Sequence, residues 1–242
     1  MGKAKASRKQ AKKENYNKQT NVVSFNKFQK QKSVSILPRN KNQETYVLKL
    51  LDEKKDIVFG IGPAGTGKTL LAVQVAVKNF KEGLVDKIVV TRPAVSVDED
   101  LGALPGTLEQ KMAPWTRPIF DVLREYFSTY EIESMIQEGI IEIAPLSYMR
   151  GRTFKNAYII ADEMQNATPN QMQMLLTRLG PGTKLVITGD LDQSDLGPEN
   201  GLQEIVYKMQ GLDLNYMTHV EMGLSDIERH PGVNEALQVL HL

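Results

Sequence analysis

Residues 62–69 read Gly-Pro-Ala-Gly-Thr-Gly-Lys-Thr and fit the phosphate-binding pattern G-x-x-x-x-G-K-[ST]. The run 56–61 before them is typical of a buried strand, and the apolar run 70–77 after them is typical of a helix that is just beginning. Strand, glycine-rich loop and helix follow one another in this motif because the backbone N–H groups of the loop and the helix N-terminus converge on an anion. This context makes a chance match in a glycine-rich turn a poor alternative. It predicts an α/β protein that binds a nucleotide.

Every residue of the loop has a predicted part in nucleotide binding. The glycines let the backbone approach the phosphates closely. Lys68 is expected to reach the β- and γ-phosphates and to serve catalysis, and the Thr69 hydroxyl is expected to bind Mg²⁺. The predicted nucleotide-binding residues of the loop are Gly62, Pro63, Ala64, Gly65, Thr66, Gly67, Lys68 and Thr69.

The net charge of +1 conceals two regions of opposite sign. Residues 1–41 contain ten Lys and two Arg against one acidic residue, a charge of +11, and residues 42–242 carry −10. We expect residues 1–41 to be a disordered basic tail and residues 42–242 to be the P-loop NTPase domain. Two interpretations of the tail stay open. It is either an arm that binds nucleic-acid phosphates or a solvated tail without such a partner.

Several classes of protein are disfavoured by composition. The chain has no cysteine, which rules out disulfides, thiolate catalysis and cysteine-based zinc sites within it, and its three histidines are scattered. We expect no membrane partner, because no apolar run has the length of a bilayer span, and no secretory signal, because no apolar stretch follows the charged N-terminus. A cytoplasmic location is therefore expected.

Apolar periodicity predicts strands that alternate with helices. The predicted strands are 57–60, 87–91, 140–144, 157–161, 185–188 and 214–218, and the predicted helices begin near residue 42 and at residue 68 and cover 108–130, 171–179 and 202–209. Pro114 and Pro118 are expected to break or bend the helix 108–130. The alternation predicts a mainly parallel sheet with helices on both faces, and the chain has space for one such core.

A second motif follows the strand 157–161. Asp162 and Glu163 come directly after this apolar run, as in the Walker B arrangement, where a buried strand delivers carboxylates at its C-terminal end. Asp162 is the candidate Mg²⁺ ligand, through water. Glu163 is the candidate base that activates the attacking water. An Asp-Glu pair alone is often only a strand end, but with a P-loop upstream the functional interpretation is the stronger one.

Two further positions are candidates for sensing or stabilising the γ-phosphate. The strand 185–188 leads into Gly189 and Asp190, and Gln193 lies just beyond, where its amide would reach the γ-phosphate or the lytic water. The alternative for this segment is an ordinary turn. Arg229 is a candidate arginine finger that would act in its own subunit or in a neighbour. The alternative for Arg229 is a surface residue before a helix.

Three arginines follow strands at the same predicted edge of the sheet. Arg92 ends the strand 87–91, and Arg150 and Arg152 follow the strand 140–144. They are candidates for binding a nucleic-acid backbone or another phosphate. Surface arginines that cap turns remain the alternative.

These motifs together resemble the PhoH family of ATPases from about Gln43 to the C-terminus. The matching strings are Phe59–Thr69, Thr91–Val95, Leu101–Gly106, Ile143–Leu146, Met149–Thr153, Asp162–Asn166, Gln171–Met172, Leu176–Gly180, Gly189–Asp190 with Gln193, and Arg229–Pro231. The chain departs from the family pattern at Met164, where Ala is usual, at Trp115, where Tyr is usual, and at Glu228, where an apolar residue is common. The short form is similar to versions carried by bacteriophages.

The resemblance implies a RecA-like core related to superfamily 1 helicases, with ATP and Mg²⁺ as cofactors. It also implies ATP hydrolysis, a connection to RNA or single-stranded DNA, and a ring-like homo-oligomer, a hexamer. By the same resemblance Gln43 would contact adenine, Gln193 would sense the γ-phosphate, and Arg229 would act at a subunit boundary. Larger family members carry a further RNA-binding or nuclease domain, which is not expected in this chain.

The leading hypothesis is an ATPase that couples hydrolysis to the binding or remodelling of RNA or single-stranded DNA. One alternative is a nucleotide-driven assembly switch without turnover. Another is a small-molecule kinase, although no arginine-rich lid lies between the motifs, and an acidic residue directly after Asp162 favours water activation over phosphoryl transfer. A nuclease is the weakest alternative, because no further carboxylates cluster with Asp162 and Glu163.

Overall fold

The computed structural model describes residues 34–93, 108–197 and 200–228, together with residues 232, 233, 235 and 239, and gives the backbone alone for 108–115. All of these lie within the compact unit Lys32–Leu242. Most of the predicted basic tail, Arg229 and the string Leu101–Gly106 lie outside the described residues.

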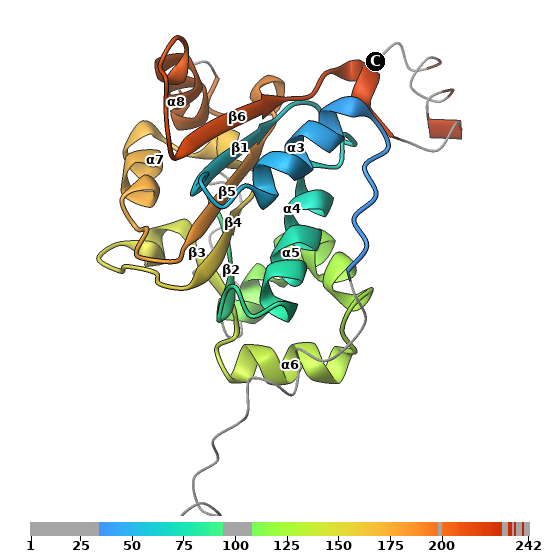
Figure 1. Ribbon diagram of the computed structural model, residues 1–242, viewed down its shortest axis with the longest axis vertical. Helices are drawn as coiled ribbons and strands as arrows, with labels where there is room; N and C mark the ends of the chain where they lie inside the picture. The colour runs from blue at the N-terminus through green and yellow to red at the C-terminus, as the bar shows by residue number, and fades with distance from the viewer. Residues whose placement is uncertain are drawn as a thin grey trace, which may run out of the picture. The chain divides into compact units, whose positions relative to one another are not determined.

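Six strands form one sheet in which every neighbouring pair is parallel. In chain order the strands are β1 (Ile57–Ile61), β2 (Lys87–Arg92), β3 (Ile141–Pro145), β4 (Ala157–Ala161), β5 (Lys184–Gly189) and β6 (Met217–Glu221). Across the sheet the order is β3-β2-β4-β5-β1-β6. The helices are α3 (Lys41–Leu51), α4 (Lys68–Lys81), α5 (Leu108–Arg124), α6 (Thr129–Gln137), α7 (Pro169–Leu176) and α8 (Gly201–Met209). Figure 1 shows these elements.

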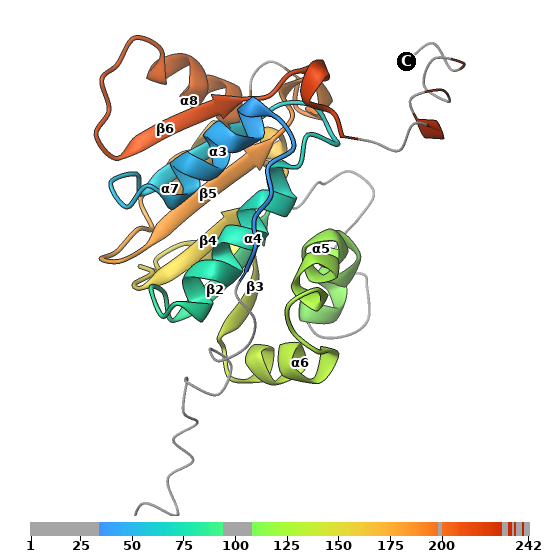
Figure 2. The same ribbon diagram turned by 45° about the vertical axis from the view of Figure 1, so that its right-hand side comes forward.

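Helices cover both faces of the sheet. Figures 1 and 2 show α3, α4 and α5 on one face and α7 and α8 on the other. The strands β1 and β4 are buried along their whole length, which explains why they read as continuous apolar runs in the sequence rather than as alternating ones. The predicted α/β class, a mainly parallel sheet with helices on both faces, is confirmed.

The core lies on both sides of the sheet. Toward α7 and α8, the side chains of Phe59, Ile159 and Ile187 are fully buried in one apolar cluster. On the other face, the ring of Tyr46 from α3 packs against Gly60 of β1, where an added Cβ would lie 2.6 Å from Tyr46 Cζ. The close approach of α3 to β1 therefore depends on a residue without a side chain.

The structure differs from the predicted elements in several places. The predicted helix 108–130 ends at Arg124, α6 was not predicted, and α7 ends at Leu176 rather than at residue 179. Helix α5 continues over both Pro114 and Pro118, so of the two predicted outcomes, a break or a bend, the break is wrong. Pro118 is exposed, so the carbonyl group that lacks its hydrogen-bond donor lies on a part of the helix that water can reach. Strand β6 begins three residues later than predicted, because pairing with β1, Ile57 opposite Met217, sets its bounds. The 3-10 turns η1 (Leu146–Met149), η2 (Met164–Asn166) and η3 (Leu191–Gln193), which directly follow strands, were not predicted.

The strand order brings the predicted motifs together. Strand β5 lies between β1, which leads into the phosphate-binding loop, and β4, which leads into Asp162 and Glu163. Because the strands are parallel, their carboxyl ends meet at one edge of the sheet, where ligands bind in folds of this class. Within the described residues, no helix combines the length and the apolar character needed to cross a membrane.

Candidate nucleotide-binding site

The phosphate-binding loop requires glycine at positions that the backbone conformation identifies. Gly62 has φ 144°, and a Cβ there would lie 2.1 Å from the carbonyl oxygen of Met222. Gly67 caps α4 with φ 84°, in the left-handed region that side chains disfavour. The loop therefore turns sharply enough to direct its N–H groups and the start of α4 at one point, as the motif predicts.

Lys68, the first residue of α4, lies folded along the inside of this loop. Its ammonium donates to the carbonyl oxygen of Gly62, to that of Pro63 at 2.8 Å, and to Thr66 Oγ1 at 3.4 Å. Burial lowers the pKa of Lys68, while the nearby carboxylates of Asp190, Glu163 and Asp162 act in the opposite direction. A buried ammonium that bonds only neutral oxygens, with carboxylates around it, suits a ligand that brings negative charge to the loop.

A hydrogen bond joins the two motifs predicted to hold Mg²⁺. Thr69 Oγ1 donates to Asp162 Oδ1 at 2.8 Å, and the hydroxyl of Thr188 on β5 donates to the same carboxylate. Asp162 and Thr188 are both buried. The described residues contain no group of three or more His, Cys, Asp or Glu able to hold a metal. The hydrogen-bonded pair of the Thr69 hydroxyl and the Asp162 carboxylate fits Mg²⁺, which keeps several waters and takes its other ligands from nucleotide phosphates.

Glu163, the candidate base, has an unusual backbone and a fixed side chain. Its φ of 55° places it in the left-handed region, which costs a residue with a side chain about 1 kcal/mol or more. Gln165 Nε2 donates to Glu163 Oε2 at 2.6 Å. The other end of the same amide, Gln165 Oε1, accepts the N–H of Asp190 at 3.1 Å. Gln165 therefore links the carboxylate of Glu163 to the segment after β5.

These groups surround a pocket of about 250 Å³ at the carboxyl edge of the sheet. Its lining consists of Ala64, Gly65, Gly67, Lys68, Thr69, Leu70, Asp162, Glu163, Gly189, Asp190 and Gln193. Eight predicted residues from three separate segments thus meet in one place: Ala64, Gly65, Gly67, Lys68, Thr69, Asp162, Glu163 and Gln193. Asp190 also accepts the N–H of Asp192 and so caps the turn η3 that carries Gln193.

Gln43 lies behind the loop rather than in the lining of this pocket. It is buried in the first turn of α3, where Asn40 caps the helix. Its Nε2 donates to the carbonyl oxygen of Thr66 at 3.0 Å, and its Oε1 accepts the N–H of Arg39 at 2.8 Å. An amide has two donors and two acceptor positions, so half of this capacity remains for a ligand.

The segment before Arg229 is attached to the phosphate-binding loop. The N–H of Glu228 donates to the carbonyl oxygen of Gly65 at 3.0 Å. Two residues earlier in the chain, Asp226 is buried and accepts the side-chain amide of Asn42 at 2.8 Å. Arg229 itself lies outside the described residues, but the residue that precedes it contacts the loop.

The three arginines predicted to bind nucleic acid have different surroundings. Arg92 is partly buried at the end of β2. Arg150 is exposed. Arg152 binds both carboxylate oxygens of Glu142 and lies over the ring of Phe154, 4.5 Å from its centroid. The hydrogen bond from Arg152 is the main cause that lowers the pKa of Glu142. The guanidinium of Arg152 is therefore already paired with a carboxylate of the same protein.

The structure also settles how the unusual Met164 is accommodated. Its side chain is fully buried in the apolar cluster under α7 and α8 and is not part of the pocket lining. The larger side chain therefore belongs to the core, while Glu163 before it and Gln165 after it face the site. The side chain of Trp115 is not among those described.

Three residues had no role assigned to them from the sequence, although two of them, Gln165 and Arg178, lie within the matched strings Asp162–Asn166 and Leu176–Gly180. Gln165 lies two residues after Glu163, and its contact with Asp190 depends on two strands being neighbours. Thr188 carried a usable signal, because it is the last residue of the predicted strand 185–188. Arg178 lies just after α7, where hydrogen bonds to its neighbours hold it.

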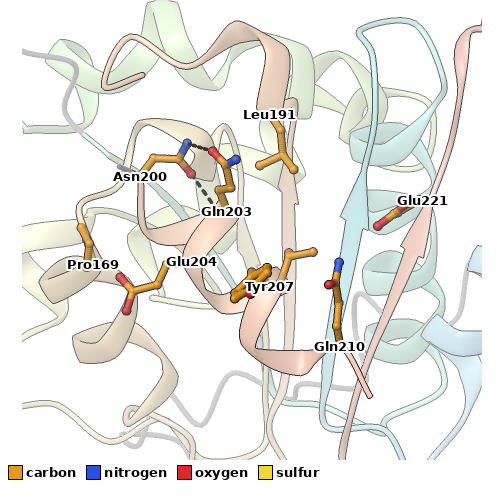
Figure 3. A pocket seen from close by; sticks show the side chains of 9 residues that line it. Pro169, Leu191, Asn200, Gln203, Glu204, Tyr207, Gln210 and Glu221 are labelled. Atoms are coloured by element: carbon orange, nitrogen blue, oxygen red, sulfur yellow. Dashed lines mark hydrogen bonds between the residues drawn. The ribbon is translucent and has the colours of Figure 1, made fainter. Parts of the chain in front are cut away.

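A larger pocket of about 620 Å³ lies apart from the phosphate-binding loop, against α8 (Figure 3). Its lining consists of Pro169, Leu191, Asn200, Gln203, Glu204, Val206, Tyr207, Gln210 and Glu221. Glu204 and Glu221 are acidic, and no lining residue is basic. This pocket is therefore a poor site for phosphate, despite its size.

Comparison with known proteins places the chain in a family. The family model described as PhoH-like protein matches residues 35–241. The chain is 47% identical over 209 residues to a PhoH-like protein of Bacillus subtilis, covering 86% of this chain and 64% of the relative. It is 44% identical over 191 residues to a PhoH-like protein of Synechocystis, covering 77% and 57%, respectively.

The chain is also 42% identical over 179 residues to Protein PhoH of Escherichia coli K12, covering 72% of this chain and 50% of the relative. It therefore spans about half to two thirds of the length of these relatives. Among solved structures, it is similar to the Pif1 helicase from Candida albicans, with 17% identity and a TM-score of 0.43, covering 86% of this chain and 44% of that one. With the family model matching most of its length and a phosphate-binding loop next to Asp162 and Glu163, the chain belongs to the PhoH family and is a P-loop NTPase.

Proposed function

We propose that this protein is a Mg²⁺-dependent ATPase that couples hydrolysis to the binding of single-stranded nucleic acid, RNA above all. The observation that carries the proposal is the hydrogen bond between Thr69 and Asp162 beside Glu163. It joins two motifs 93 residues apart in the sequence into one site. A P-loop alone would support nucleotide binding only, whereas the adjoining carboxylates support hydrolysis.

Each residue of the site has a distinct role in this proposal. Lys68 exchanges its loop carbonyls for the β- and γ-phosphates. Thr69 and Asp162 hold Mg²⁺, which would neutralise charge on the phosphates. Glu163 orients and deprotonates the attacking water, and Gln193 contacts the γ-phosphate or that water. Gln43 contacts adenine with the part of its amide that the protein leaves unused.

The lining of the pocket favours hydrolysis over phosphoryl transfer to a small molecule. Among the described residues that line it, Lys68 is the only basic one. A kinase of this class needs further basic groups over the phosphates, and the presence of Glu163 in the pocket lining supports water activation instead. An assembly switch without turnover remains the second candidate, because it needs the same nucleotide site, and turnover separates the two.

We propose a ring of six subunits in which Arg229 reaches the nucleotide of a neighbour. The family resemblance and the contact between Glu228 and the loop support this assignment. Light scattering of the purified protein with and without nucleotide measures the mass of the assembly. A monomer under both conditions would exclude a role for Arg229 between subunits.

Replacement of the base tests the function directly. Glu163→Gln should keep ATP affinity within about twofold and reduce turnover about 10²–10⁴-fold, because the amide preserves the shape but cannot accept the proton. Glu53→Gln is the matched control, since Glu53 is exposed and lies before β1, at the opposite edge of the sheet. Binding of a fluorescent ATP analogue and phosphate release measure the two quantities.

Two results would count against the proposal. Unchanged turnover in Glu163→Gln would show that another group is the base. Tight ATP binding by the unaltered protein without any phosphate release, with or without single-stranded RNA, would favour the assembly switch.

A further inference from the structure

A second pocket at the carboxyl edge of the sheet differs in charge from the two already described. It has a volume of about 800 Å³ and lies between the turn η1 and helix α7. Its lining consists of Ser147, Arg150, Gly151, Asn170, Gln171, Gln173, Met174, Thr177 and Arg178, a set we call the η1–α7 groove. Two arginines, three amides and two hydroxyls line the groove without any acidic residue.

Arg178 is held in place by neutral groups. Its guanidinium donates to the carbonyl oxygen of Met174 at 2.9 Å, to that of Arg152 at 3.1 Å, and to Thr177 Oγ1 at 2.8 Å. None of these acceptors carries a charge, so the positive charge of Arg178 is not neutralised by them. The bond to Arg152 also joins the end of α7 to the segment after η1, so the two walls of the groove are fixed to each other before any ligand binds.

Arg150 is exposed on the opposite wall. In the described part of the chain it has neither a hydrogen bond nor an ion pair, in contrast to Arg152, whose guanidinium is occupied by Glu142. The side chains of Asn170 and Gln173 are exposed in the same groove and make no hydrogen bond with the described residues. A charged groove with unused donors and no acids is suited to an extended polyanion.

An exposed aromatic residue lies on the same turn. Tyr148, between Ser147 and Arg150 in the sequence, is 62% exposed. Aromatic side chains beside a basic groove provide a surface on which unpaired bases stack. Single strands offer both phosphates and unpaired bases, whereas a duplex offers only the phosphates and an acidic protein segment offers neither.

We infer that the η1–α7 groove binds the phosphate backbone of single-stranded nucleic acid through Arg150 and Arg178, with Tyr148 stacking on a base. This rests on the proposed nucleic-acid-coupled ATPase. It also gives a route for coupling, because α7 begins six residues after Glu163 and is joined to it by the turn η2. Figure 1 shows α7 on the face of the sheet opposite α4, the helix that begins at the phosphate-binding loop.

A salt series separates the two kinds of contact. The full chain is titrated against a fluorescent 15-nucleotide RNA and DNA of the same sequence, between 50 and 200 mM salt. Arg150→Ala should weaken binding about tenfold at low salt and reduce the slope of log affinity against log salt by about 0.7, the value for one phosphate contact on a single strand. Lys54→Ala, which removes an equal charge at an exposed site before β1, should change neither.

Tyr148→Ala should weaken binding by about tenfold while the salt slope stays unchanged, because a stacking contact releases no counterions. Equal melting temperatures of the variants and the unaltered protein serve as the folding control. Arg178 is not replaced first, since its hydrogen bonds hold the groove together.

Photochemical crosslinking locates the strand independently of affinity. A single strand that contains 4-thiouridine should crosslink to peptides that include residues 147–150 or 170–178. Crosslinks confined to other peptides would overturn the inference, and so would Arg150→Ala and Tyr148→Ala that bind as the unaltered protein does.

The inference and the proposed function fail in different ways. If the unaltered protein binds neither RNA nor DNA at 50 mM salt, the nucleic-acid coupling itself is wrong and the groove has no such role. If the strand binds and changes turnover, but the groove variants are unaffected, the coupling stands and the groove is not its site. Preference for RNA over DNA would add contacts with the 2′-hydroxyl, to which the amides of the groove are suited.

Discussion

At the scale of single residues, the site depends on how Glu163 is held. Its backbone lies in the left-handed region, and Gln165 holds its side chain by donating to Glu163 Oε2 while it accepts the N–H of Asp190. Because Asp190 precedes the turn that carries Gln193, one amide contacts both the proposed base, Glu163, and the segment that leads to the predicted sensor. Gln165 is therefore a positioning residue and not a catalytic one.

Gln165→Ala should lower kcat by about tenfold or more and leave ATP affinity nearly unchanged, because a misplaced base slows the reaction without removing a contact to the nucleotide. Asn166→Ala is the matched control on the same turn, since among the described residues the Asn166 side chain accepts only the N–H of Asp195, in an exposed segment. Steady-state kinetics and nucleotide titration give the two constants. A loss of affinity equal to the loss of kcat would indicate a general distortion instead.

At the scale of elements, α3 is fixed to the sheet at two points. Its middle packs through Tyr46 onto Gly60, and the ammonium of Lys184 on β5 donates to the carbonyl oxygens of Leu50 at 2.6 Å and Asp52 at 2.9 Å. The second contact satisfies carbonyls at the helix C-terminus, which have no partner within the helix. Since α3 also carries Gln43, its placement sets that side of the nucleotide site.

Gly60→Ala should lower the free energy of unfolding by about 1–3 kcal/mol, because the new methyl group would overlap the buried Tyr46 ring. Gly223→Ala is the control, since a Cβ there would have no neighbour within 4 Å and its φ is negative. It should change stability by less than about 0.5 kcal/mol. Urea unfolding measures both, and equal effects would show that α3 is free to shift.

Lys184 gives the contact at the end of α3 a pH dependence. Burial lowers its pKa from 10.5 to about 8, against the opposing effect of nearby Asp52, Asp56 and Glu53. Below about pH 8 both folded and unfolded chains carry the proton, and the folded state bears the cost of the buried charge. Between about 8 and 10.5 the unfolded chain binds more protons, so stability due to this residue rises with pH.

The unfolding free energy of the unaltered protein relative to Lys184→Met should therefore be constant up to about pH 8 and increase above it. Urea unfolding at several pH values between 7 and 10 measures the difference. A difference that stays flat over this range, or that falls, would mean that Lys184 titrates normally in the folded protein.

At the scale of the whole molecule, the charge is uneven along the chain, and removing the basic tail tests its two interpretations. Residues 1–33 carry a net charge of +9, and a chain that begins at residue 34 keeps Asn40, the cap of α3. If the tail is an arm for nucleic acid, removing it should weaken RNA binding at low salt and flatten the salt dependence by about 0.7 per lost phosphate contact. Identical slopes for the two chains would identify a solvated tail.

Much of the fold could be predicted because strands that are buried on both faces read as apolar runs. Strand β4 has the predicted bounds, and β1, β2, β3 and β5 differ from theirs by a residue or two. The predicted start of β6 was three residues too early, because its weaker apolar pattern does not mark where pairing with β1 begins. Of the predicted break or bend at Pro114 and Pro118, the break was wrong because tertiary packing overrides local propensity along α5.

The sequence by itself determined which chemistry is proposed for the nucleotide site. Lys68, Thr69, Asp162 and Glu163 belong to motifs in which function requires particular residues at fixed spacing, so the roles proposed for them follow from a short stretch of chain. The tertiary structure decided which other residues join them. The contacts of Gln165 and Thr188 depend on strand order and on contacts between distant segments. The same holds for the contrast between Arg152, which is paired with Glu142, and Arg150, which has no ion pair among the described residues. Such contacts leave no local pattern, because the hydrogen bonds form only after the sheet has brought the segments together.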